Sequence, residues 1–255
     1  MQVRYFIEIA YNGKNYFGWQ RQPEQISVQQ VLEETISTLL RKEIKFTGAG
    51  RTDTGVHAKQ LFAHFDSDDI ENFDDFIFRM NSFLPKDISI RNIFEVKEDA
   101  HARFDAVERE YEYVISLEKD PFSQDFAFQI NNTPNVALMD QAAEMLLAHR
   151  DFQCFSRSRT DVKTYNCTIV KAFWEATDNR LIFTIAADRF LRNMVRAIVG
   201  TLLDVGYGKT TLEDFKAILK SKSREEAGAS APAHGLYLTK VVYPESIFKR
   251  TEKKE

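Results

Sequence analysis

The sequence has little cysteine and no long apolar run. Its 255 residues include two cysteines, Cys154 and Cys167, without C-x-x-C spacing, so they predict neither a disulfide framework nor a zinc site. No apolar stretch reaches the roughly 18 residues of a transmembrane helix. Arg4 and Glu8 interrupt the apolar run of residues 1–11, which therefore does not resemble a signal peptide. These absences predict a soluble protein of the reducing cytoplasm.

An excess of basic residues is also missing. The formal net charge is −4 at pH 7, whereas proteins that bind nucleic acid usually carry a basic surface. The charges are segregated along the chain, with an acidic run in residues 66–75. This separation permits a positive surface on an acidic protein, although most charge runs are ordinary solvated faces. Two basic groups stand out: Arg150, Arg157, Arg159 and Lys163, then Arg189, Arg192 and Arg196.

The first half of the chain predicts a β-α-β-β-α-β order of elements. Alternating apolar residues are typical of strands, and a spacing of three to four is typical of helices. Ser27 stands three residues before Gln30 and predicts a capping box at the start of a helix. Strands are expected at residues 3–11, 44–47, 58–65 and 88–96, and helices at residues 28–40 and 73–84.

The second half predicts the same order, with a further helix. Strands are expected at residues 110–117, 165–177, 181–187 and 236–243, and helices at residues 138–149, 189–205 and from a Thr210–Glu213 capping box to Lys220. The fold class is therefore α+β, with two split βαβ units whose antiparallel sheets are flanked by helices. The expected domains are residues 1–106 and 107–248, followed by a charged tail, 249–255.

One loop gathers residues that can perform chemistry. Residues 48–57 read GAGRTDTGVH and place Arg51, Asp53 and His57 within seven residues. Glycines permit close approach of a ligand to the backbone. The loop is not a P-loop, because the Gly-Lys-Ser/Thr ending is absent, and its glycine spacing is not that of a dinucleotide-binding fingerprint. On these grounds alone, a structural turn and a functional loop are equally supported.

The same loop resembles the active-site motif of the tRNA pseudouridine synthase A family. In residues 149–155, which resemble the His-Asp-Phe block of that family, Arg150 is one inserted residue. The resemblance extends from about residue 3 to residue 243, and six blocks in register are far more specific than any one of them. The other five blocks are residues 11–22 (YNGKNYFGWQRQ), 101–113 (HARFDAVEREYEY), 149–155 (HRDFQCF), 190–200 (FLRNMVRAIVG) and 233–238 (AHGLYL).

The resemblance implies an enzyme that isomerises uridine to pseudouridine without a cofactor. It implies that Asp53 is the nucleophile, while attack on C1′, attack on C6 and abstraction of a ribose proton stay open. Arg196 would keep the carboxylate of Asp53 ionised. Tyr111 would stack on the flipped uracil and could help to remove the C5 proton, unless it is a core tyrosine. Arg51 would help to turn the nucleotide out of its stack. The active site would lie in a cleft between the two domains.

The resemblance also implies partners. The substrates would be uridines at positions 38, 39 and 40 in the anticodon arm of tRNA, recognised by shape and backbone. The protein would be a cytoplasmic homodimer without metal or membrane contact, and its basic groups would lie along the RNA. Gln20, Arg21 and Gln22 would touch RNA.

Two other functions are weaker alternatives. A phosphate hydrolase would need a lysine near the loop and a pair of metal-binding acids; Lys59 is available, but no acidic pair is evident. A non-catalytic RNA-binding protein could stack bases on its sheets. The presence of Asp53, Tyr111 and Arg196 argues against that second alternative.

Overall fold

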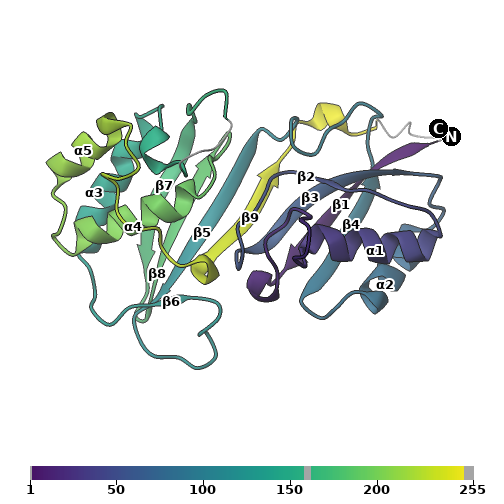
Figure 1. The fold of residues 1–255 in the computed structure, drawn as a ribbon, viewed down its shortest axis with the longest axis horizontal. Coiled ribbons are helices and arrows are strands. Elements are labelled where there is room, and N and C mark those ends of the chain that lie inside the picture. Colours follow the sequence, from purple (N-terminus) through teal and green to yellow (C-terminus); the bar gives the residue numbers. More distant parts are fainter. Residues whose placement is uncertain (1, 158–161, 250–255) are drawn as a thin grey trace, which may run out of the picture. The chain divides into compact units, whose positions relative to one another are not determined.

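The computed structural model describes residues 2–157 and 162–249. Two compact units are present (Figure 1). The first unit contains the chain up to Val107 and again from Leu238, and the second unit is Glu108–Tyr237. Arg159 and residues 250–255 of the expected tail lie outside the described residues. Among the described residues, no helix is long and apolar enough to cross a membrane.

The first unit is built on a central strand. β1 pairs antiparallel with both β3 and β4, and β2 pairs antiparallel with β3. α1 and α2 contact each other, and α2 also contacts β4. The elements are β1 (Val3–Tyr11), the 3₁₀ turn η1 (Gly13–Asn15), α1 (Val28–Leu40), β2 (Thr47–Gly48), β3 (His57–Ser67), α2 (Phe73–Phe83) and β4 (Ile88–Glu95).

Both faces of β1 are buried near the middle of the strand. Tyr5 and Phe6 are fully buried although successive strand residues point to opposite faces. Tyr5 packs against Phe73 at the start of α2, with ring centroids 5.9 Å apart. Phe6 packs against Tyr243 on the other face, with centroids 5.1 Å apart. The returning C-terminal segment therefore covers the sheet face that the two helices leave open.

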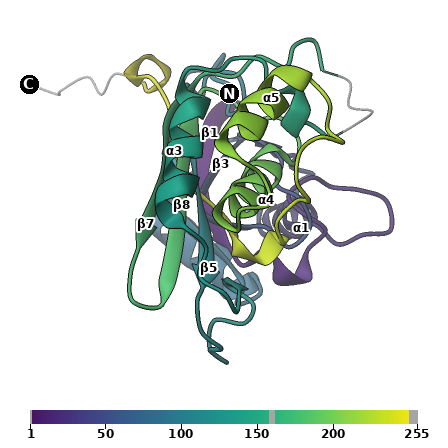
Figure 2. The same cartoon turned by 90° about the vertical axis from the view of Figure 1, so that its left-hand side faces the viewer.

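The second unit has a mixed sheet. β8 pairs antiparallel with β5 and β7, whereas β6 runs parallel to β5. α3 packs on β7, and α3, α4 and α5 contact one another (Figure 2). The elements are β5 (Glu108–Ser116), β6 (Phe128–Gln129), α3 (Val136–Leu147), η2 (Gln153–Phe155), β7 (Ile169–Ala176), β8 (Arg180–Ala187), α4 (Met194–Gly206), α5 (Leu212–Ser221) and η3 (Ala233–Gly235). β9 (Leu236–Val242) then crosses the unit boundary, and η4 (Glu245–Ile247) follows.

The mixed α+β class is confirmed, with one correction to the sheets. The expectation of purely antiparallel sheets is wrong in the second unit, because β6 joins β5 in parallel. The first unit has the expected order β-α-β-β-α-β. Of the expected capping box, the Ser27 half forms: its Oγ accepts a hydrogen bond from the Gln30 N–H at 3.3 Å, whereas the Gln30 side chain donates to Glu34 Oε1 at 2.9 Å.

Two predicted strand boundaries are wrong because hydrogen bonds bind the backbone elsewhere. The strand expected at residues 44–47 is confined to β2, because α1 side chains bind the preceding backbone: the Ile44 N–H donates to Ser37 Oγ and the Phe46 N–H to Glu33 Oε1. β7 begins at Ile169 because residues 165–167 pair with the backbone of residues 150–152.

The third wrong boundary is the start of the late helix. α4 begins at Met194 and not at residue 189. Asn193 adopts a left-handed conformation with φ 65°, which is incompatible with a continuous helix through it. The next capping box is also shifted by one residue, from Thr210 to Thr211. Thr211 and Asp214 satisfy each other's backbone N–H, each at 3.1 Å.

Candidate active site

The Asp53 loop connects β2 to β3 in the first unit. Asp53 is half-buried, whereas Arg51 and Thr54 are exposed. The Val56 N–H donates to the Asp53 carbonyl at 3.1 Å and closes a turn. Gly55 has φ 78°, a conformation that favours glycine. The Asp53 side chain therefore projects from a tight turn immediately before a buried strand.

The segment that follows β1 packs on this loop through its backbone. The Trp19 N–H donates to the Thr52 carbonyl at 3.4 Å, and the Gly55 N–H donates to the Tyr16 carbonyl at 3.3 Å. The hydroxyls of Tyr11 and Thr52 are 2.8 Å apart. These bonds hold the residues on both sides of Asp53.

Two glycines make this close packing possible. A Cβ atom at Gly13 would lie 2.0 Å from the Val56 carbonyl oxygen, and one at Gly18 would lie 2.3 Å from the Thr52 carbonyl oxygen. Gly18 also has φ 81°. Real Cβ atoms do not tolerate such distances, so any side chain there would displace the Asp53 loop.

Buried side chains complete the support. His57 is buried, and its Nδ1 accepts a hydrogen bond from the Gly13 N–H at 3.0 Å. Trp19 is also buried and lies so close to Gly48 that a Cβ there would be 2.4 Å from the indole nitrogen. Residue-by-residue analysis of the sequence did not identify Trp19, Gly13 or Gly18 as functional. The sequence feature that marks Gly13 and Gly18 is their spacing in residues 11–22, and Trp19 lies in the same block.

Arg51 is the outermost member of a polar chain. Its Nε donates to Gln20 Oε1 at 3.3 Å, and Gln20 Nε2 donates to Gln29 Oε1 at 2.8 Å. Gln29 in turn donates to the buried Glu33 at 2.9 Å. Arg21, one of the expected RNA contacts, donates to the other oxygen of Glu33 at 2.9 Å. Arg51 is thus oriented from the buried face of α1.

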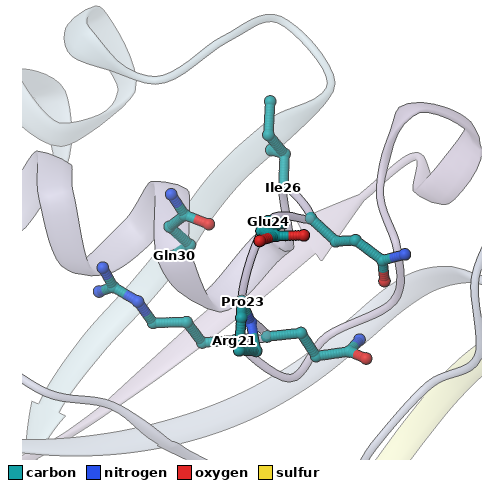
Figure 3. A pocket seen from close by; sticks show the side chains of 7 residues that line it. Arg21, Pro23, Glu24, Ile26 and Gln30 are labelled. Carbon is teal, nitrogen blue, oxygen red and sulfur yellow. The ribbon is translucent and has the colours of Figure 1, made fainter.

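An open pocket lies beside the start of α1. It has a volume of about 480 Å³. Figure 3 shows the Arg21 guanidinium below the side chain of Gln30, with Ile26 above Glu24 and Pro23. Arg21 lines this pocket, but none of Asp53, Arg51, Tyr111 and Arg196 does. The full lining is Arg21, Gln22, Pro23, Glu24, Gln25, Ile26 and Gln30.

Tyr111 and Tyr113 of β5 differ in their surroundings. Tyr113 is fully buried, and its hydroxyl donates to the Pro232 carbonyl at 2.8 Å. Burial raises the pKa of Tyr113, and the charge of Arg196 only partly opposes that rise. Tyr111 is half-buried and packs edge-on against Phe190, with ring centroids 5.1 Å apart. Tyr113 is therefore the core tyrosine, and part of Tyr111 is accessible.

Arg196 is fixed near the start of α4. Its Nε donates to the Ala231 carbonyl at 2.7 Å, and its own carbonyl accepts from the Ala231 N–H at 2.9 Å. The side chain is half-buried. These two bonds give the guanidinium a defined orientation.

The described residues bring the predicted site residues together in pairs. Arg51 and Asp53 share a loop of the first unit. Tyr111 and Arg196 belong to the second unit, where Arg196 lies close enough to affect Tyr113, two residues from Tyr111 on the same strand. That one site combines both pairs stays a prediction.

A backbone hydrogen bond joins the two basic groups of the second unit. The Arg157 N–H donates to the Arg192 carbonyl at 3.1 Å. Both of these arginines are exposed, as are Arg150 and Lys163. The two groups that the sequence separates are therefore neighbours.

The described residues also bear on metal binding and on the two thiols. Among the described residues, no three His, Cys, Asp or Glu side chains are placed to hold a metal ion. Cys154 and Cys167 are both free and buried, and burial raises the pKa of each thiol to about 12.

Comparison with known proteins identifies relatives along nearly the whole chain. A family model described as tRNA pseudouridine synthase matches residues 8–105 and 142–244. A Bacteroides thetaiotaomicron protein named tRNA pseudouridine synthase A is 48% identical over 254 residues, covering 98% of this chain and 94% of the relative. Proteins of the same name from Porphyromonas gingivalis and Francisella tularensis are 49% and 38% identical, each covering 96% of this chain and 99% and 96% of the relative.

Proposed function

Because the chain belongs to the tRNA pseudouridine synthase family and isomerises uridine in tRNA, we propose that it does so in the anticodon stem-loop with Asp53 as the nucleophile. The observation that carries the proposal is the fixed turn around Asp53, with backbone bonds at Thr52, Asp53 and Gly55. A nucleophile held in a fixed position reacts without first having to be ordered.

The reaction needs only groups that the chain supplies. The N1–C1′ bond of uridine breaks, the uracil turns, and a C5–C1′ bond forms; C5 loses its proton and N1 gains one, so the atoms and the oxidation state are unchanged. A carboxylate can assist by attacking C1′, attacking C6 or removing a ribose proton. Each role requires an ionised Asp53, and no cofactor is needed.

Arg51 is proposed to turn the target nucleotide out of the stem-loop. Enzymes that modify bases extrude the nucleotide before they react with it. Arg51 is exposed, yet its Nε is oriented by Gln20 at 3.3 Å. An arginine in this position can fill the vacated space or bind a phosphate.

Tyr111 and Arg196 are proposed to act on the same uridine. The half-buried ring of Tyr111, held edge-on by Phe190, can stack on the uracil. The guanidinium of Arg196 supplies the positive charge that favours the ionised nucleophile. Its bond to the Ala231 carbonyl limits its motion, which supports a role that needs a fixed orientation.

The remaining expectations belong to the same proposal. The exposed basic residues of the second unit would bind the tRNA backbone, and the enzyme would work as a cytoplasmic homodimer. We also propose that each unit derives from a split βαβ motif and matches most of one predicted domain, although residues 238–248 of the predicted second domain belong to the first unit. The β4-β1-β3 order of the first unit supports the split βαβ part of this proposal.

The test is to incubate the protein with unmodified tRNA transcript and to map pseudouridine. Wild-type protein should modify positions 38, 39 or 40, and Asp53→Asn should slow the reaction at least about 10³-fold while still binding tRNA. Asp68→Asn, which changes an exposed aspartate of the same unit, is the matched control. Product outside the anticodon arm would contradict the proposed substrate position.

Further variants separate the proposed roles. Arg196→Met should slow single-turnover product formation, and a near-normal rate would contradict its pairing with the nucleophile. Tyr111→Phe keeps the ring and removes the hydroxyl. A wild-type rate for Tyr111→Phe would mean that the hydroxyl takes no part in proton transfer.

A further inference from the structure

An exposed phenylalanine projects from the loop between β4 and β5. Phe104 is 73% exposed and lies in the sequence His-Ala-Arg-Phe-Asp of residues 101–105. An apolar ring that faces water loses the free energy that its burial would provide. A lone exposed ring is common on protein surfaces and by itself needs no explanation. The unusual feature is how firmly the backbone under this ring is held.

His101 and Asp105 fix the backbone of the loop from within. His101 Nδ1 accepts hydrogen bonds from the Arg103 N–H at 3.1 Å and from the Phe104 N–H at 3.3 Å. Asp105 Oδ2 accepts from the His101 N–H at 2.7 Å, and the Asp105 N–H donates back to the His101 carbonyl at 3.1 Å. The loop therefore forms a closed turn.

The core of the first unit fixes the same loop from below. The Ala102 N–H donates to Nδ1 of the buried His64 at 3.0 Å, and the Ala102 carbonyl accepts from the Tyr243 hydroxyl at 2.5 Å. Arg4 donates to the Ala100 carbonyl at 3.1 Å. All five backbone N–H groups of residues 101–105 thus have acceptors. The backbone of the loop cannot rearrange to bury Phe104 without breaking several of these bonds.

The exposed surface of the loop combines an aromatic ring with a cation. The rings of His101 and Phe104 are 4.2 Å apart between centroids and tilted by 32°. The guanidinium carbon of Arg103 is 5.7 Å from the centroid of the Phe104 ring. His101 therefore supports the ring, and the positive charge of Arg103 lies over it.

We propose that Phe104 and Arg103 form a preorganised platform on which an unpaired nucleobase of the tRNA stacks, with Arg103 binding the adjoining phosphate. This inference rests on the proposed function, which supplies the RNA. Unpaired bases are recognised by stacking on aromatic side chains, and arginine binds phosphate. A platform that is already ordered loses little entropy on binding. A flat ring beside a guanidinium matches a base and its phosphate, which favours RNA over a second copy of this chain as the occupant.

The first measurement is the tRNA affinity of Phe104→Ala. Removal of one stacked base contact should weaken the Kd roughly ten- to one-hundredfold. Phe78→Ala is the matched control, because Phe78 lies in α2 of the same unit and is 71% exposed; its Kd should not change. Arg103→Gln should lower the slope of log K against log salt by about 0.7–0.9, the value of one phosphate contact.

The second measurement distinguishes stacking from a structural role. The Phe104→Trp variant should lose tryptophan fluorescence in proportion to bound tRNA, whereas the Phe78→Trp variant should not. A wild-type Kd for Phe104→Ala together with unquenched fluorescence in F104W would overturn the platform. Altered self-association in sedimentation with unchanged tRNA affinity would also overturn it, because the surface would then contact protein. The proposed function is judged separately, by whether wild-type protein forms pseudouridine at the anticodon arm.

Discussion

The Asp53 loop and the start of α4 are both held by distant chain segments, but by different means. Asp53 is positioned by its backbone: hydrogen bonds on either side of it connect the loop to residues that follow β1. Arg196 is positioned by its backbone and also by its side chain, whose Nε binds the Ala231 carbonyl. Backbone bonds therefore fix the residues around Asp53, and in Arg196 a side-chain bond also fixes the guanidinium.

The segment that holds Arg196 is itself held by side chains. Arg224 donates to the carbonyls of Ala227 and Gly228 at 3.2 and 3.0 Å. Thr201 Oγ1 accepts from the Gly228 N–H at 3.0 Å. In the first unit backbone bonds at Thr52 and Gly55 are joined by side-chain contacts of Tyr11 and His57. The two supports should therefore respond differently to substitutions and to pH.

The largest effect is expected for Gly18→Ala. The new Cβ would lie 2.3 Å from the Thr52 carbonyl oxygen, at a residue with φ 81°. Strain and overlap should lower the free energy of unfolding by about 3 kcal/mol. Displacement of Asp53 should slow pseudouridine formation at least about tenfold. Urea unfolding and single-turnover rates measure the two effects.

Gly50→Ala is the matched control in the same loop. No atom lies within 4 Å of a Cβ built at Gly50. Its free energy of unfolding should change by less than about 0.5 kcal/mol. Equal loss of stability in the two variants would mean that close backbone packing at Gly18 does not hold the loop.

A smaller effect is expected for Gly200→Ala in α4. Alanine normally stabilises a helix by about 1 kcal/mol relative to glycine. At this position its Cβ would lie 1.7 Å from the Ala229 carbonyl oxygen. We expect a net loss of about 2 kcal/mol in the free energy of unfolding, with slower turnover because the segment that binds Arg196 must move.

Ala217→Gly provides the reference for that prediction. Ala217 is an exposed residue of α5, so this change should cost only the ordinary helix propensity of about 1 kcal/mol. If Gly200→Ala instead raises thermal stability, the contact between α4 and residues 229–231 is less tight than we infer.

An effect of similar size is a dependence of stability on pH in the first unit. Burial lowers the pKa of His64 from 6.5 to about 4, helped by the charges of Arg4 and His101 and opposed by Asp66 and Asp105. Between about pH 6.5 and 4, His64 is therefore protonated in the unfolded chain but not in the folded chain. Stability should be complete above about pH 6.5 and should fall, by on the order of 2 kcal/mol, as the pH drops toward 4.

His64→Asn isolates this contribution. Asparagine can present its Oδ1 where Nδ1 accepts from the Ala102 N–H, but it does not titrate. Urea unfolding at several pH values should show a flatter profile for the variant between pH 6.5 and 4. Parallel profiles for variant and wild type would assign the pH dependence to the carboxylates of the protein.

Local patterns predicted much of the fold. Period-two alternation and the Ser27 cap predicted β1 and the start of α1, because the residues that determine them are neighbours in sequence. The same patterns misplaced β2 and the start of α4. There the backbone is bound by Glu33 and Ser37 of α1 or turned by the left-handed Asn193, which periodicity does not reveal.

The sequence by itself determined the family and the order of elements in the first unit, and it pointed to Asp53, Arg51, Tyr111 and Arg196. Only the tertiary structure decided that Tyr113 and not Tyr111 is the core tyrosine, and that Arg196 is tied to Ala231. The physical reason is the range of the interactions. Caps and periodicities act over a few residues, whereas the partner of a buried hydroxyl or guanidinium is chosen among segments far apart in the chain.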